Sequence, residues 1–146
     1  MNDARNPTTV MGSFPVLVID DNEADRKLMA IQLGQAWPFV RDLLVEEAAS
    51  GQEALDKLRD RRFALIVLDW KMPGISGFDV LHHMRKNGVR IPVVVVSGLE
   101  RVDIPADLES LAASFLNKDQ MTTENLHEAI AQSLRLLGSA RSSTAG

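Results

Sequence analysis

Short apolar runs that stop at polar residues recur along the chain. The runs at 64–68 and 93–96 lack the alternation of a half-exposed strand, which is typical of strands covered on both faces of a parallel sheet. Similar runs occupy 16–19, 43–48 and 114–116, although Glu46 and Glu47 make the second of these less regular. The pattern therefore predicts five strands.

Four segments between and after these runs carry apolar residues at helical spacing, over 23–35, 50–62, 77–87 and 123–138. A fifth, short helix is expected over 105–112, because Pro105 suits a first helical turn. Ser50 with Glu53 forms a capping-box pattern, and Gly138 is expected to close the last helix. The side chains expected to face inward include Ala24, Leu28 and Ile31 in the first helix, and Leu126, Ile130, Leu134 and Leu137 in the last.

Strand and helix alternate five times, which predicts right-handed crossovers and a parallel sheet with helices on both faces. The expected fold is α/β and flavodoxin-like: a doubly wound (βα)5 domain with strand order 2-1-3-4-5. At 146 residues the chain suits one domain, which we expect over 13–138, with flexible tails at 1–12 and 139–146.

Composition excludes several classes of function. Sixteen basic residues against twenty acidic ones give a net charge of −4, and no Lys/Arg-rich run occurs, which argues against direct binding to nucleic acid. There is no cysteine, so disulfides and cysteine-ligated metal sites are excluded. No apolar run has the length of a membrane span, and 1–12 lacks a signal-peptide core. We therefore expect a cytoplasmic protein that does not contact the membrane.

Polar side chains follow four of the five expected strands. Asp20 and Asp21 follow the first, Asp69 the third, Ser97 the fourth and Lys118 the fifth. With strand order 2-1-3-4-5, the carboxyl ends of the first and third strands flank the switch point where such sheets bind ligands. Crowded carboxylates repel one another or recruit a hard cation such as Mg²⁺. A hydroxyl and an ammonium beside them suit phosphoryl transfer, which needs positioning and charge neutralisation.

At these residues the chain resembles the receiver domains of two-component response regulators, among them the single-domain chemotaxis regulator. The resemblance covers about 13–138. Its motifs are Asp20-Asp21, Asp69-x-x-Met72-Pro73-x-x-x-Gly77, Ser97-Gly98, and Lys118 after Phe115-Leu116. Each motif alone is more often an ordinary turn or helix start. Their joint arrival at the ends of strands on one rim favours a functional site.

The resemblance implies a role for each of these residues. Asp69 would be phosphorylated by a sensor histidine kinase, a phosphotransfer protein or a small phosphodonor. Mg²⁺ would be held directly by Asp21 and Asp69, mostly through water by Asp20, and by the main-chain carbonyl of Lys71. Ser97 and Lys118 would bind the phosphoryl oxygens, and Phe115 would be the aromatic switch residue. The domain would act as a signalling switch. It would catalyse only its own phosphorylation and dephosphorylation, and so would not be an enzyme in the usual sense.

The output of such a switch would be a contact with an effector protein that the sequence does not name, and a phosphorylation-dependent dimer is a further possibility. We expect Ser97 to move toward the phosphoryl group, so that Phe115 turns inward and remodels the face formed by the short helix over 105–112, the last strand and the last helix. Asp119 follows Lys118 where the family usually has a cis proline. A non-proline cis bond costs roughly 3–4 kcal/mol, so we expect a trans bond and a reshaped loop.

Two other functions are compatible with parts of the pattern. A Mg²⁺-dependent phosphatase of the haloacid-dehalogenase type also uses an aspartyl nucleophile, but it carries a second Asp two residues later, where this chain has Lys71. A receiver-like interaction module that is never phosphorylated is the other alternative, and the retained Asp69, Ser97 and Lys118 argue against it.

Overall fold

The structure is a computed structural model that describes residues 13–38, 42–98 and 111–145. In this part of the chain, five parallel strands form one sheet in the order β2-β1-β3-β4-β5. The strands are β1 (Ser13–Ile19), β2 (Asp42–Ala48), β3 (Leu65–Asp69), β4 (Val93–Ser97) and β5 (Ala113–Asn117). The predicted strand count, direction and order are confirmed.

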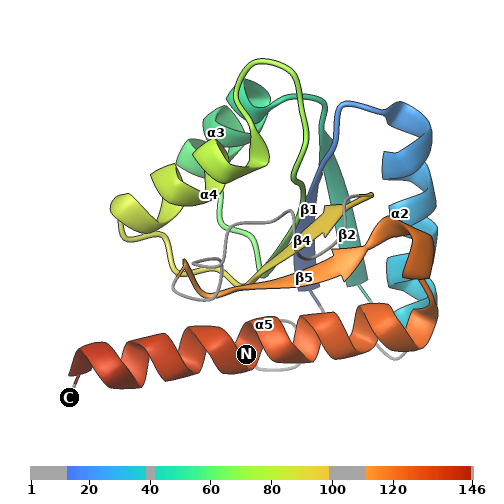
Figure 1. Ribbon diagram of the computed structural model, residues 1–146. Coiled ribbons are helices and arrows are strands. Elements are labelled where there is room, and N and C mark those ends of the chain that lie inside the picture. The colour runs from blue at the N-terminus through green and yellow to red at the C-terminus, as the bar shows by residue number, and fades with distance from the viewer. Residues whose placement is uncertain (1–12, 39–41, 99–110, 146) are drawn as a thin grey trace, which may run out of the picture.

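Helices cover both faces of the sheet, as Figure 1 shows. On one face lie α2 (Glu23–Ala36) and α5 (Thr123–Ala145), and on the other lie α3 (Gly51–Asp60) and α4 (Gly77–Lys86). This is the doubly wound, flavodoxin-like fold that the sequence predicts. The tail at 1–12 and nearly all of the helix expected over 105–112 lie outside the described residues. No helix in the described segments is long and apolar enough to cross a bilayer.

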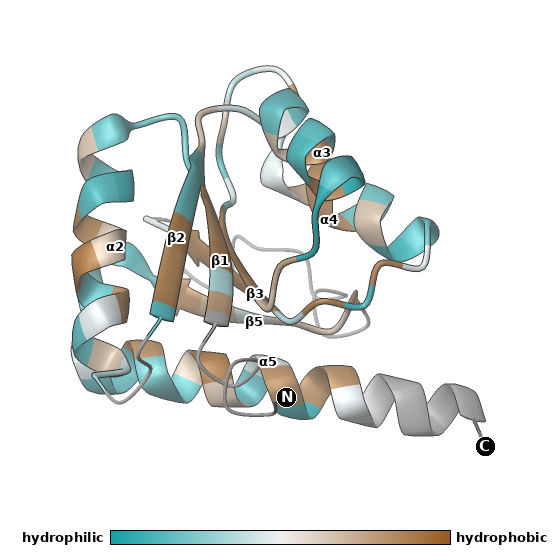
Figure 2. Cartoon of the chain, turned by 180° about the vertical axis from the view of Figure 1, so that it is seen from behind, coloured by the Kyte–Doolittle hydropathy of each residue, from teal (hydrophilic) through white to brown (hydrophobic). Residues whose placement is uncertain are grey.

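The sheet separates two hydrophobic clusters. Because side chains alternate along a strand, Val16 and Val18 of β1 face α2 and α5, whereas Leu17 and Ile19 face α3 and α4. All five residues of β3 and of β4 are buried, which explains their continuous apolar runs. Figure 2 shows this apolar interior between helices whose outer faces are largely hydrophilic.

The edge strand β2 is only partly buried, and its two glutamates are paired with basic residues. Glu47 accepts hydrogen bonds from Arg26 at 2.9 Å and from Lys27 at 2.7 Å. Glu46 pairs with Arg61 and Lys57. The interrupted apolar pattern of this strand therefore reflects a sheet edge next to solvent, where charged side chains also discourage pairing with another sheet.

The inward face of α2 differs from the predicted one. Met29, Leu33 and Ala36 are buried, whereas Leu28 and Ile31 are more than half exposed. Both sets have helical spacing, so periodicity alone could not choose between them. Arg26 lies on the same side of the helix as Met29 and Leu33, and it donates to the main-chain oxygen of Asp20 at 2.7 Å, which is consistent with the observed orientation.

The C-terminal helix also departs from the prediction. Leu126 and Ile130 are buried as expected, but Leu134 is exposed and Ser133 takes a buried place, donating to the Ile130 carbonyl at 2.6 Å. The helix runs through Gly138 to Ala145, so the prediction that Gly138 ends it is wrong. The flexibility expected over 139–146 stays a prediction. A glycine inside a helix costs only about 1 kcal/mol relative to alanine.

Candidate functional site

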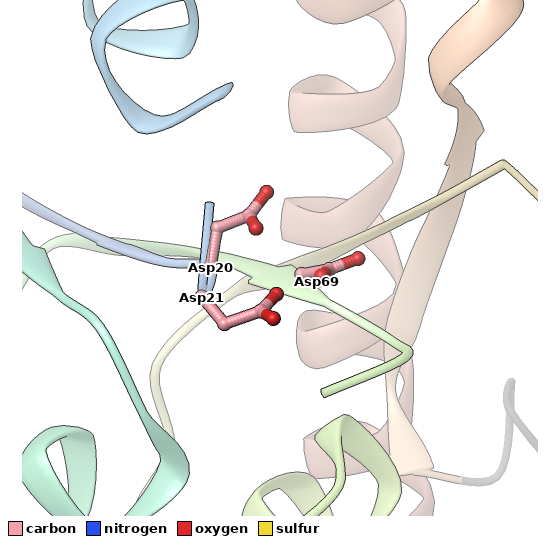
Figure 3. A group of neighbouring side chains, drawn as sticks. All are labelled: Asp20, Asp21 and Asp69. Carbon is pink, nitrogen blue, oxygen red and sulfur yellow. The ribbon is translucent and has the colours of Figure 1, made fainter. Parts of the chain in front are cut away.

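Three carboxylates meet at the carboxyl ends of β1 and β3. Asp20 and Asp69 are buried and Asp21 is exposed, and each offers an oxygen within 4.8 Å of the others. Figure 3 shows the three side chains grouped at these strand ends. Asp20 is fixed in part by the main-chain N–H of Asn22, which donates to its Oδ1 at 2.9 Å. The predicted convergence at the switch point of the sheet is confirmed.

Tight backbone packing holds Asp69 in place. The N–H of Trp70 donates to the carbonyl of Val96 on β4 at 2.9 Å, and the N–H of Gly77 donates to the carbonyl of Trp70 at 3.1 Å. A Cβ atom added at Gly77 would lie 2.5 Å from the carbonyl oxygen of Asp69 and 2.8 Å from the Cα of Trp70. Only glycine allows α4 to begin this close to the end of β3.

Lys118 brings a positive charge to the carboxylates from the end of β5. It opens a 3₁₀ helix, η3 (Lys118–Gln120), that follows Asn117, and the described residues contain no cis peptide bond. The trans Lys118–Asp119 bond is therefore as predicted. The Nζ atom of Lys118 lies 3.2 Å from the carboxylate of Asp20, 3.5 Å from that of Asp69 and 3.0 Å from that of Asp25. Asp25 was not among the predicted site residues.

The ionisation of Asp69 is strongly perturbed. Its pKa is raised from 3.8 to about 6, mainly because burial disfavours the charged form and secondly because Asp20 repels it. Lys118 opposes these effects without cancelling them. For Lys118 itself, burial alone would lower the pKa, but the hydrogen bond to Asp25 and the charges of Asp69 and Asp20 outweigh burial and raise it. The site is thus an excess of buried negative charge beside one firmly charged ammonium group.

The other predicted site residues border the same space. Ser97, the last residue of β4, is 1% exposed, and it lines a cavity of about 350 Å³ together with the carboxylates, Lys71, Gly98 and Lys118. Lys71 is exposed at the rim. Phe115 on β5 is half-buried and packs against the hydrophobic cluster that contains Trp70. The structure therefore gathers the predicted site residues around one cavity, with Phe115 in the adjoining core; the ligand role of the Lys71 carbonyl stays a prediction.

The donor set suits Mg²⁺. Three carboxylates offer hard oxygen ligands from two strand ends, and one of them, Asp21, is open to solvent, so that water can complete a coordination shell. A bound cation would neutralise part of the negative charge at Asp69. It would thereby offset both the cost of burying the charged Asp69 carboxylate and the repulsion between Asp69 and Asp20.

Comparison with known proteins decides the family. The family model described as the response regulator receiver domain matches residues 16–131. The chain belongs to this family. Asp20, Asp21, Asp69, Ser97 and Lys118 all lie within the matched range.

Curated relatives of this receiver domain are longer proteins. It is 33% identical over 119 residues to a protein-glutamate methylesterase/protein-glutamine glutaminase of Myxococcus xanthus. The aligned region covers 82% of this chain and 34% of the relative. It is also 33% identical over 104 residues to the transcriptional regulatory protein AfsQ1 of Streptomyces coelicolor, covering 70% and 44%. The chain thus spans less than half the length of these relatives.

Solved structures of similar fold include the response regulator TrrA of Thermotoga maritima in complex with Mg²⁺ and BeF, at 27% identity and a TM-score of 0.67, covering 82% of this chain and 98% of that one. The chemotaxis response regulator CheY4 of Vibrio cholerae is 25% identical with a TM-score of 0.68, covering 83% and 98%. These likenesses agree with the strand order and with a receiver domain of ordinary size.

Proposed function

We propose that this receiver domain accepts a phosphoryl group on Asp69, with Mg²⁺ as cofactor, and passes the signal to an effector protein. The donor would be a sensor histidine kinase, a phosphotransfer protein or a small acyl phosphate. The observation that carries the proposal is the meeting of three carboxylates with the Lys118 ammonium at one switch point. Membership of the receiver family and the Mg²⁺–BeF complex of TrrA support it.

The chemistry is a displacement at phosphorus. A carboxylate oxygen of Asp69 forms the new P–O bond while the bond from phosphorus to the donor oxygen or nitrogen breaks, and the departing group keeps the electron pair. Bound Mg²⁺ would supply charge neutralisation for the phosphoryl oxygens. Lys118 adds an ammonium, and the Ser97 hydroxyl can donate a hydrogen bond from the cavity wall. Asp69 is buried and lines the wall of the cavity, which limits the approach of water.

Labelling with acetyl phosphate tests the proposal. Wild type incubated with acetyl phosphate and Mg²⁺ should gain one phosphoryl mass by intact mass spectrometry, and EDTA should prevent the gain. Asp69→Asn, which keeps the shape of the side chain but removes the nucleophile, should stay unmodified. An unmodified wild type would favour the non-phosphorylated interaction module, and sustained release of inorganic phosphate from unrelated phosphomonoesters would favour a phosphatase.

We infer further that phosphorylation acts through Ser97 and Phe115. A phosphoryl group adds a charge of roughly −1.5 to −2 and strong hydrogen-bond acceptors. Charge-assisted hydrogen bonds contribute roughly 1.5–3 kcal/mol each, so Ser97 and Lys118 together could supply about 3–6 kcal/mol. Inverting a two-state population needs about 5.5 kcal/mol. Only the upper end of this range therefore reaches the free energy needed for Ser97 and Lys118 together to reposition the half-buried ring of Phe115 on the neighbouring strand.

The Ser97→Ala variant checks this coupling. It should still be labelled at Asp69, but the change in the chemical environment of Phe115, followed by NMR of a specifically labelled ring, should be lost. An unaltered response of Phe115 in Ser97→Ala would contradict the coupling. Gel filtration with and without acetyl phosphate shows whether the output includes a phosphorylation-dependent dimer.

A further inference from the structure

The ammonium group of Lys118 is shared among three carboxylates, and the nearest of them is outside the cation site. Nζ lies 3.0 Å from Asp25, against 3.2 Å from Asp20 and 3.5 Å from Asp69. An ammonium group has three N–H donors and can donate to all three carboxylates at once, but its single Nζ atom lies closest to Asp25 and farthest from Asp69. Lys118 is thus held slightly away from Asp69, the residue whose phosphoryl group it would have to bind.

Among the described residues, the Asp25 carboxylate pairs with Lys118. It lies in the first turn of α2, where its main-chain N–H is already bound by the Asn22 side chain at 2.9 Å. Its carboxylate does not belong to the group that could hold a metal, which consists of Asp20, Asp21 and Asp69. The side chain is 44% exposed, so a neutral replacement there leaves the core intact.

The pair of Asp25 and Lys118 also stands between two cavities. Both residues line the cavity of the phosphorylation site, and both line a second cavity of about 110 Å³ beneath α2, with apolar walls that include Val18, Val67 and Met121. Space on either side means that Lys118 can shift by a rotation of its own side chain, without displacing packed neighbours. The ion pair to Asp25 is then a restraint that can be released.

We propose that Asp25 is a positioning residue that competes with Asp69 for Lys118 and thereby slows phosphorylation. The inference rests on the proposed phosphoryl transfer at Asp69. While Asp25 holds the ammonium group, less positive charge reaches the incoming phosphoryl oxygens. Removal of this carboxylate leaves Lys118 to Asp20 and Asp69 and brings it nearer to the site of reaction.

The test compares initial rates of labelling by acetyl phosphate in the presence of Mg²⁺. Asp25→Asn should be labelled about twofold to fivefold faster than wild type, the range expected for release of a half-exposed ion pair. Asp25→Glu restores a carboxylate and should return toward the wild-type rate. Glu23→Gln is the matched control: it removes the same charge from the same helical turn, but Glu23 is exposed and lines neither cavity, so its rate should stay near that of wild type.

A double-mutant comparison shows whether Asp25 acts through Lys118. In a Lys118→Ala background, adding Asp25→Asn should change the rate no more than Glu23→Gln does. Labelling of Asp25→Asn at the wild-type rate, or acceleration equalled by Glu23→Gln, overturns the inference while the proposed function stands. A wild type that acetyl phosphate cannot label at all overturns both.

Discussion

The buried charge of Asp69 should lower the free energy of unfolding of the metal-free protein. Replacing Asp69 by asparagine should therefore stabilise the protein. The carboxyl group has a pKa of about 6 in the folded protein and an ordinary value of 3.8. Because the folded-state pKa is raised, the folded protein binds the proton more tightly than the unfolded chain does. The destabilisation by the buried carboxylate is therefore fully present above about pH 6. It shrinks as the pH falls and vanishes below 3.8, the pKa of Asp69 in the unfolded chain.

The magnitude follows from the size of the shift. One pKa unit corresponds to 1.36 kcal/mol, so a rise from 3.8 to about 6 sets an upper bound of about 3 kcal/mol at pH 7.5. The carboxylate lines a cavity that opens to the surface, and screening there reduces the expected gain of Asp69→Asn to about 1–2 kcal/mol. At pH 4.5 linkage leaves only about a third of that gain.

Urea unfolding in the presence of EDTA, at pH 7.5 and at pH 4.5, measures both values. Asp42→Asn is a suitable control, because Asp42 is an exposed carboxylate at the opposite end of the sheet, at the start of β2. The reasoning fails if Asp69→Asn is no more stable than wild type at pH 7.5, or if its gain is as large at pH 4.5. Adding Mg²⁺ should stabilise wild type more than Asp69→Asn, since only wild type keeps all three carboxylates.

Three further predictions concern the surroundings of Asp69. Gly77→Ala should destabilise the protein by about 1–3 kcal/mol in urea unfolding and slow labelling, because its Cβ would press on the Asp69 carbonyl; unchanged stability would mean that α4 moves aside freely. Trp70 fluorescence should change on titration with Mg²⁺, since this buried residue directly follows Asp69 in the chain, and a flat titration would argue against cation binding there. Lys71→Ala should shorten the lifetime of the phosphorylated form if the exposed Lys71 side chain shields it from water; an unaltered decay rate would show that this lysine is merely solvated.

The site could be predicted from the sequence because its residues sit where strands end. A carboxylate directly after an apolar run has little freedom once the run is placed in a parallel sheet, and the order of strands then brings Asp20, Asp21 and Asp69 together. Ser97 and Lys118 follow from the same rule, since Ser97 ends β4 and Lys118 directly follows β5.

Features that depend on tertiary contacts between residues distant in sequence could not be predicted in this way. Helix α2 carries two apolar stripes, and the buried one around Met29 and Leu33 lies on the side where Arg26 contacts Asp20 and Glu47. Asp25 looks like an ordinary first-turn acidic residue, because its partner Lys118 is distant in sequence. The one signal in the sequence was its place one helical turn after the Asp20-Asp21 pair.

The central claim is that Asp69 itself carries the phosphoryl group. Borohydride reduction of acetyl phosphate-labelled protein converts an aspartyl phosphate to homoserine, which peptide mass spectrometry can locate. The account predicts homoserine at position 69, dependent on Mg²⁺ during labelling. Homoserine at another aspartate, or a phosphoryl group that resists reduction and remains on a hydroxyl or imidazole side chain, would contradict it.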